Sequence, residues 1–402
     1  MTQNLGTNSP SFLRDIKIFR SIILLLVCIS TFTQGLVAQT TDALSFEASY
    51  LSDYVNSPYS TLSTGTAYMG MIDLAASLNT ETANLWPGGE FFFQLQNTHG
   101  ATASESLVGD LQVFSNIDNG NYTFLYQLLY TQSIGALSLT IGSHDVNELF
   151  VASDYGGEYI NSSFGLMPTV SMNVMISSFP KPCLGAILQY QFTPVFTFKT
   201  AVYEGDPLCL DDEPYNTKFS IDTNQGYFAI AEGNYTYSLG ENFSNTYTFG
   251  GYYHSSQFDD IVNPNTAHKG NYGLYFIADQ QLSASHKKDK KLGSFVKFGI
   301  APKNRNEYPF FWALGLNYYA PFTKRANDVL GLAMASLSIN RSLIGTELPY
   351  QHKNEQVIEC FYKASIGDNI SIQPEIQYII NPGAVLANNN TTIGLVRTHI
   401  TF

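Results

Sequence analysis

The sequence predicts an all-β protein, a transmembrane antiparallel β-barrel of about 16 strands that follows a cleaved signal peptide. In the C-terminal segment 393–402, Val396, Ile400 and Phe402 share one face of an extended strand, and Arg397 lies on the other. A strand with one apolar and one charged face fits a wall with lipid outside and water inside. The chain is rich in aromatics, with 26 Tyr and 28 Phe, and only 13% of it is charged, which indicates strands and turns.

The first forty residues have the features of an export signal. Basic side chains precede an apolar run that begins at Ile22, and segment 35–38 offers a cleavage site after it. The basic residues are Arg14, Lys17 and Arg20. We therefore expect a signal peptide at 1–38 and one outer-membrane barrel domain at 39–402. No later stretch approaches the roughly 18 apolar residues that a transmembrane helix needs.

Alternation of apolar and polar side chains recurs from Phe46 to the C-terminus without a linker or a low-complexity tract. The clearest strands are 137–142, 295–300, 356–363 and 370–378. The last of them gathers polar side chains on one face, which suits a wet lumen rather than a dry core. Pro374 cannot donate to the ladder there, so we expect a bulge or a place where that hydrogen bond is dispensable.

Short turns and longer polar loops alternate between the expected strands. Ile366–Asn369 and Lys287–Lys291 are short, whereas Gly205–Asn224 is long. Short turns on one side and long loops on the other are usual for bacterial barrels. About 360 mature residues, at roughly 20 to 23 per strand and loop, give about 16 strands and an aqueous channel.

Charge and cysteine content limit the partners. The 20 Lys and Arg against 33 Asp and Glu, a net charge of −13, argue against nucleic acid and leave a cation-leaning or a sugar-binding lumen open. In an oxidising envelope Cys183 and Cys209 could pair across a loop, and unpaired cysteines are the alternative. Cys28 would suit a lipoprotein only after a small residue, and Val27 is large. The sequence has neither a metal-ligand spacing nor a catalytic motif. We therefore expect that the protein is not an enzyme and that it binds neither a metal nor a cofactor.

Short motifs follow one another along the chain and are specific as an ordered set. They are Tyr68–Leu74, Leu85–Gly89, Val108–Gln112, Leu129–Gln132, Leu139–Phe150, Tyr159–Gly165, Val202–Pro207, Gly250–Tyr253, Tyr272–Tyr275, Pro302–Arg305, Gly315–Tyr318 and Ile372–Gly383. With these motifs the chain resembles the carbohydrate-selective porin (OprB-type) family of bacterial outer membranes over residues 46–402. Gln127 departs from the family, which often has an acid there. The resemblance implies a 16-stranded barrel and passive uptake of saccharides.

The segment after the strand that ends at Gly142 is the expected constriction. His144–Glu148 begins a loop that we expect to fold into the lumen and to narrow it. Asp145, Asn147 and Glu148 would then accept hydrogen bonds from sugar hydroxyls. The alternative is that these groups cap turns or brace the loop against the wall. A metal site in the same segment would lack a second ligand cluster.

Further charged side chains are expected on the water side of the wall. An arginine facing lipid at mid-depth costs roughly 2 to 4 kcal/mol, which favours the lumen for Arg397. Arginines could orient sugar hydroxyls, or they could form buried pairs with carboxylates that stiffen the wall. The complete set of expected pore-lining residues is Asp145, Asn147, Glu148, Arg305, Arg325, Glu359, Glu375 and Arg397. The face on which Glu232 lies stays undecided, because apolar residues alternate in phase with it along the expected strand.

The sequence thus predicts an integral outer-membrane channel for passive diffusion of mono- and small oligosaccharides into the periplasm, with a weak sugar-binding constriction. One rival is a general or cation-leaning porin without a sugar site. A rival from another class is a plugged structural or adhesive barrel. Besides sugar and outer-membrane lipid, we expect the barrel assembly machinery to recognise the terminal Phe402. A homo-oligomer is compatible with the sequence.

Overall fold

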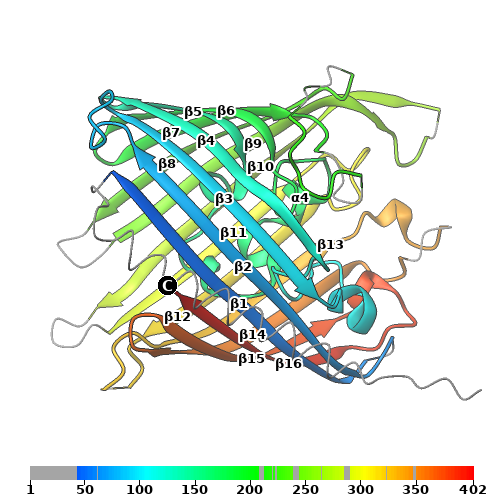
Figure 1. The fold of residues 1–402 in the computed structure, drawn as a ribbon. Coiled ribbons are helices and arrows are strands. Elements are labelled where there is room, and N and C mark those ends of the chain that lie inside the picture. Colours follow the sequence, from blue (N-terminus) through cyan, green and yellow to red (C-terminus); the bar gives the residue numbers. More distant parts are fainter. Residues whose placement is uncertain are drawn as a thin grey trace, which may run out of the picture.

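A closed antiparallel β-barrel makes up the structure, a computed structural model (Figure 1). The described residues are 43–60, 62–207, 212–219, 221, 224–238, 244–263, 265–284, 290–322, 324–346 and 350–402. Within these ranges sixteen strands follow one another round the barrel in chain order, and β16 pairs with β1 to close it. The predicted architecture and the predicted number of strands are confirmed.

The strands are β1 (Leu44–Tyr59), β2 (Gly65–Asn79), β3 (Gly89–Gly100), β4 (Tyr122–Ile134), β5 (Leu137–His144), β6 (Cys183–Thr193), β7 (Phe196–Glu204), β8 (Tyr227–Ser238), β9 (Ser244–Asp259), β10 (Ala267–Ala284), β11 (Lys291–Ile300), β12 (Phe310–Tyr319), β13 (Val329–Ser338), β14 (Asn354–Ile366), β15 (Ile370–Ile380) and β16 (Thr391–Thr401).

Side chains alternate between the lumen and the outer surface along the strands. In β16, Arg397 is on the inner face with 9% of its surface exposed, whereas Val396 is on the outer face with 39% exposed. The outer face continues to Phe402, as the terminal alternation predicts. Glu232, undecided from the sequence, is on the inner face of β8 and is buried.

The two ends of the barrel differ in the length of their connections. Turns such as 135–136 and 194–195 lie at the barrel end where β1 starts and β16 ends. Short turns are typical of the periplasmic end of bacterial barrels, so we assign this end to the periplasm. Long connections such as 101–121 and 145–182 lie at the opposite end. This arrangement confirms the expected contrast between short turns and long loops.

Short helical elements lie in the long connections. They are η1 (Ser104–Val108), α2 (Val146–Leu149), η2 (Gly156–Glu158), α3 (Ser162–Gly165), α4 (Pro168–Ser171), η3 (Arg341–Leu343) and η4 (Pro382–Ala384). In the part of the chain that the structure describes, no helix is long and apolar enough to cross a membrane.

Pro374 sits in β15 without a bulge. The ladder between β14 and β15 has no pairs opposite Gln373 and Pro374, and it resumes in the same register at Ile372. The missing donor is therefore placed where the ladder is already interrupted, the second of the two arrangements expected for this proline.

Two expectations fall on residues outside the described ranges. The signal peptide at 1–38 is one of them. Cys209 is the other, so its pairing with the buried Cys183 stays a prediction.

A buried ion pair joins the first and last strands. Arg397 donates through Nε and Nη2 to the two carboxylate oxygens of Asp53, each at 2.7 Å. Asp53 is fully buried and also accepts a hydrogen bond from Ser115 Oγ at 2.6 Å. A buried pair is costly to break from one side, because the remaining charge is left desolvated and unpaired. The closing seam of the barrel therefore depends on both residues.

We expect Arg397→Met to lower the free energy of unfolding by about 3 to 5 kcal/mol, because Asp53 would be left as an unpaired buried charge. Urea titration of folding into detergent micelles or lipid vesicles measures the change. Lys218→Met is the control, since the Lys218–Glu213 pair has side chains 58% and 31% exposed. Exposed pairs contribute about 0 to 1 kcal/mol. Equal effects of the two substitutions would contradict a structural role for the seam pair.

Candidate functional site: the barrel lumen

Two long connections fold back into the barrel. The first inward segment, 101–121, joins β3 to β4, and the second inward segment, 145–182, joins β5 to β6 (Figure 1). Both contact inner-face residues of distant strands, as their hydrogen bonds below establish. The predicted inward loop after β5 is confirmed, whereas the first inward segment was not anticipated from the sequence.

Glu355 of β14 holds the first inward segment. Its carboxylate accepts the backbone N–H groups of Leu111 at 2.8 Å and of Gln112 at 2.9 Å. It also accepts the N–H of Gly383 at 2.7 Å, from the β15–β16 connection. The side chain is fully buried. One wall carboxylate thus satisfies three backbone donors that would otherwise be buried without partners.

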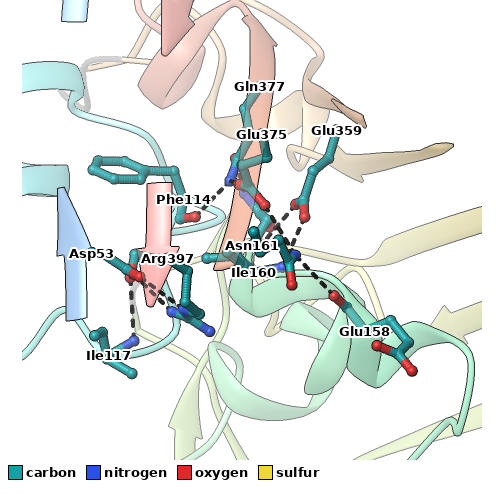
Figure 2. Close-up of polar contacts among 12 residues, drawn as sticks. Asp53, Phe114, Ile117, Glu158, Ile160, Asn161, Glu359, Glu375, Gln377 and Arg397 are labelled. Carbon is teal, nitrogen blue, oxygen red and sulfur yellow. Dashed lines mark hydrogen bonds and ion pairs between the residues drawn. The ribbon is translucent and has the colours of Figure 1, made fainter. Parts of the chain in front are cut away.

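Glu359, also on β14, holds the second inward segment in the same way. It accepts the backbone N–H groups of Ile160 at 2.8 Å and of Asn161 at 3.0 Å, as Figure 2 shows. Asn161 Nδ2 also donates to Gln377 Oε1 on β15 at 3.2 Å. Glu359 was expected to line the pore, and it does lie on the inner face, but the inward segment covers it completely.

Glu375 and Arg397 belong to the same buried cluster (Figure 2). Glu375 accepts a hydrogen bond from Gln377 Nε2 at 2.7 Å, and the same amide donates to the carbonyl of Phe114 at 2.7 Å. Arg397 interacts electrostatically with Glu375 and Glu359 besides its pair with Asp53. Gln377 thus links Glu375 to both inward segments, through Phe114 and Asn161.

Acids and a lysine extend this bracing to β8, β10 and β11. Lys297 is fully buried and donates to backbone carbonyls of the second inward segment, including that of Phe164 at 2.8 Å. Asp279 accepts a hydrogen bond from Ser153 Oγ at 2.7 Å. Glu232 accepts the N–H of Val151 at 3.1 Å. The inner face from β8 to β16 therefore serves as a docking wall for the inward segments.

Asp145 and Asn147 form the start of α2. Asp145 caps this helix by accepting the N–H of Asn147 at 2.7 Å, and it also accepts the N–H of Phe179 at 3.0 Å and the hydroxyl of Tyr126. Burial raises the pKa of Asp145. Asn147 Nδ2 donates to the carbonyl of Phe150 at 3.2 Å. The capping and bracing alternative describes what these two side chains do in the structure.

The histidine of this segment is also engaged. His144 Nδ1 lies 2.9 Å from the hydroxyl of Tyr203 on β7. Across the described residues, no group of three or more His, Cys, Asp and Glu side chains is arranged to hold a metal ion.

Glu148 differs from the other acids of the lumen. Its side chain is exposed, and among the described residues its carboxylate has no hydrogen-bond or ion-pair partner. Desolvation inside the barrel, followed by the like charges of Asp145 and Asp73, raises the pKa of Glu148 to about 7. This carboxyl group therefore titrates near neutral pH.

Polar side chains of β2 and β3 complete the surroundings of Glu148. Asp73 on β2 accepts hydrogen bonds from Gln94 Nε2 and Gln96 Nε2 of β3, each at 2.8 Å. Gln127 Nε2 of β4 donates in turn to Gln94 Oε1 at 2.9 Å. Asp73 and Gln94 are half-buried, whereas most charges on the docking wall are fully covered. We call Glu148, Asp73 and Gln94 the constriction cluster.

The two remaining expected residues lie at opposite ends of the barrel. Arg305, in the β11–β12 connection, donates to the carbonyl of Gly270 at 2.7 Å and packs 5.8 Å from the ring centre of Tyr272. Arg325, in the β12–β13 turn at the periplasmic end, pairs with Asp328. The structure brings together Glu359, Glu375 and Arg397 but leaves these two arginines outside that cluster.

Sequence reasoning missed Asp73 and Gln94. Signals for both were present, because Asp73 lies in the motif Tyr68–Leu74 and Gln94 alternates with the outward Phe91 and Phe93. Their relation to Glu148 was not visible, since it depends on how the second inward segment crosses the lumen.

Comparisons with known proteins agree with this geometry. The family model described as "Carbohydrate-selective porin, OprB family" matches residues 63–402. Porin B of Pseudomonas aeruginosa is 22% identical over 375 residues, covering 83% of this chain and 82% of that protein. The putative porin QuiX of Acinetobacter baylyi is 24% identical over 233 residues, so the match spans 52% of this chain and 53% of QuiX.

A solved structure shares the fold. The high-pH structure of Pseudomonas putida OprB has a TM-score of 0.81 and 19% sequence identity, and the match covers 90% of this chain and 94% of that one. At this identity the similarity establishes the barrel architecture.

We expect Glu359→Ala to loosen the second inward segment, because the N–H groups of Ile160 and Asn161 would lose their acceptor. Single-channel recording measures the effect as several-fold more current noise than in the wild type. Glu90→Ala is the control, since Glu90 is exposed near the periplasmic end of β3. Unchanged noise in the Glu359 variant would show that this carboxylate does not hold the segment.

We expect the preference for cations over anions to rise with pH, with a midpoint near pH 7. The raised pKa leaves Glu148 mostly neutral below pH 7 and negatively charged above it, so the lumen gains a negative charge as pH increases. Reversal potentials in a KCl gradient between pH 5.5 and 8.5 measure this. Glu148→Gln should flatten the profile, and an equal slope in that variant would assign the titration to another group.

Proposed function

We propose that this chain admits mono- and small oligosaccharides past a weak binding site at the constriction cluster. The chain belongs to the OprB family of carbohydrate-selective porins. Like the family, it is a β-barrel of the bacterial outer membrane, and sugars cross it without an energy source. The free carboxylate of Glu148, exposed in the lumen beside Asp73, is the observation that carries the proposal.

The chemistry of the constriction cluster suits a neutral sugar. Hydroxyl groups donate to the carboxylates of Glu148 and Asp73, and the amide of Gln94 can both donate and accept. A channel site must bind weakly, because a tightly held sugar would block the passage. Exposed groups that remain in contact with water meet this condition better than groups that are fully desolvated.

The braced charges have a supporting role in this proposal. Glu359 bonds the second inward segment, Glu375 bonds Gln377, and Arg397 bonds Asp53. A sugar would therefore have to displace protein groups to reach them. The contribution of Glu359 is to position the second inward segment, and with it Glu148. Arg305 and Arg325 would meet sugars only at the two mouths of the channel.

The test of this function is the single-channel conductance of the refolded protein in a planar bilayer, titrated with glucose and with maltose. A steady current that falls saturably as sugar is added supports a binding site in an open pore. A steady current that does not change with sugar would favour the general or cation-leaning porin. The carboxylates of the constriction cluster would then attract cations into the channel. No current from a folded barrel would favour the plugged alternative.

The remaining partners are part of the same proposal. The exposed terminal Phe402, on the outer face after β16, is the group that the barrel assembly machinery would recognise. Outward apolar side chains such as Leu314 and Leu332 would contact outer-membrane lipid or a second barrel.

We expect Glu148→Ala to weaken the sugar block about three- to tenfold, because one charged hydrogen-bond acceptor is lost. The open-channel conductance should change little, since the side chain carries no structural contact. The half-blocking glucose concentration gives the effect, and Glu81→Ala, in the exposed β2–β3 turn, is the control. An unchanged half-blocking concentration would remove Glu148 from the sugar site.

A further inference from the structure

A lysine stands over two tyrosine rings on the periplasmic side of the second inward segment. Lys291 is the first residue of β11, on the inner face, and its Nζ lies 4.2 Å from the ring centre of Tyr319 on β12. The same nitrogen lies 5.9 Å from the ring centre of Tyr155 in the second inward segment. The two rings are 6.1 Å apart. We call Lys291, Tyr155 and Tyr319 the lysine–tyrosine shelf.

The ammonium group of the shelf is free to bind a ligand. Among the described residues, Lys291 has contacts with aromatic rings but no carboxylate partner and no hydrogen-bond acceptor for its three donors. Its neighbour Lys363 on β14 is paired with Glu158. Lys363 and Glu158 compensate each other, which leaves the ammonium of Lys291 as the unpaired charge of these three partly buried side chains. Asp154 and Asp279 are further charged groups that interact with Tyr155.

The shelf is held in place by the wall. Gly293 faces the Tyr155 ring so closely that a Cβ there would lie 2.1 Å from it, so a glycine is needed for the ring to pack. Asn317 Nδ2 donates to the carbonyl of Tyr155 at 3.0 Å. Tyr319 Oη lies 3.4 Å from Glu158 Oε1, which links the shelf to the Glu158–Lys363 pair. These contacts position a cation, two rings and hydroxyl-binding groups together before any ligand arrives.

We propose that the lysine–tyrosine shelf is a second saccharide station, on the periplasmic side of the constriction, that prefers sugars carrying one negative charge such as hexuronates. This rests on the proposed function, since it assumes that saccharides traverse the lumen. The free ammonium would pair with the sugar carboxylate by a charge-assisted hydrogen bond. Glu158 would accept hydrogen bonds from ring hydroxyls, and the Tyr319 hydroxyl would donate or accept. The partly exposed Tyr319 ring offers an apolar surface to C–H groups, while the buried Tyr155 ring supports the lysine from below.

The station and the constriction cluster offer a solute unpaired groups of opposite charge. The constriction cluster contains carboxylates on β2 and on α2, whereas the shelf carries its free ammonium on β11, on a distant part of the barrel wall. A neutral sugar would therefore be held mainly at the constriction, and an acidic sugar mainly at the shelf. The two classes of sugar can be distinguished experimentally by which substitution relieves their block.

The test is current block by glucuronate and by glucose, each added to either side of a bilayer in about 0.1 M KCl, where screening is moderate. We expect glucuronate to block at a roughly tenfold lower concentration than glucose when it is added from the periplasmic side. Lys291→Met should remove this advantage and leave the glucose block unchanged. Lys291→Arg should retain it, which also shows that the position tolerates replacement in a folded barrel.

Lys290→Met is the matched control. Lys290 is the preceding residue and packs 5.8 Å from the ring centre of Tyr318, which points outward, so the same charge is removed from the other face of the wall. A glucuronate block that is no stronger than the glucose block, or that falls equally in the Lys290 and Lys291 variants, would overturn the proposal. If glucose blocks and glucuronate has no advantage, the shelf alone fails. If neither sugar blocks an open channel, the proposed function fails with it.

Discussion

Backbone N–H groups of the two inward segments donate to carboxylates of the barrel wall, and the shape of the lumen depends on these hydrogen bonds. Irregular backbone inside a barrel exposes donors that strands would satisfy, and each one left buried without a partner costs about 1 to 3 kcal/mol. Glu355 and Glu359 accept four such groups between them, and Glu355 also accepts the N–H of Gly383 in the β15–β16 connection. The wall thus uses its acids in the way that a helix N-terminus uses a capping residue.

This bracing divides the lumen into two parts with different chemistry. From β8 to β16 most of the inner face is covered by the inward segments, and its buried charges are engaged within the protein, whereas Lys291 on β11 remains partly exposed. On β2 and β3, and at Glu148 on the inner side of α2, polar groups remain accessible. The net acidity of the chain is therefore divided between acids that hold the fold together and acids that a solute can meet. Only the second group can influence selectivity directly.

Much of the fold can be predicted from the sequence, but less of the candidate site can. Period-two alternation identifies the inner face of β16, because Arg397 cannot face lipid cheaply, and it identifies Glu359 and Glu375 as inner residues. Alternation cannot tell whether an inner residue is met by water or by another part of the chain. The contact of Ile160 with Glu359 spans 199 positions, and no local pattern encodes it. The first inward segment lacks periodicity altogether, so only its contacts with β1, β14 and β15 reveal where it goes.

The most direct test of this account is amide hydrogen exchange in the wild-type protein in detergent micelles, resolved at Leu111, Gln112, Ile160 and Asn161. These amides lie in loops, yet we expect them to exchange as slowly as strand amides of β14 and β15, because wall carboxylates hold them. Exchange at the rate of exposed loop amides would contradict it. The inward segments would then be mobile, and the position of Glu148 in the lumen would not be fixed by the wall.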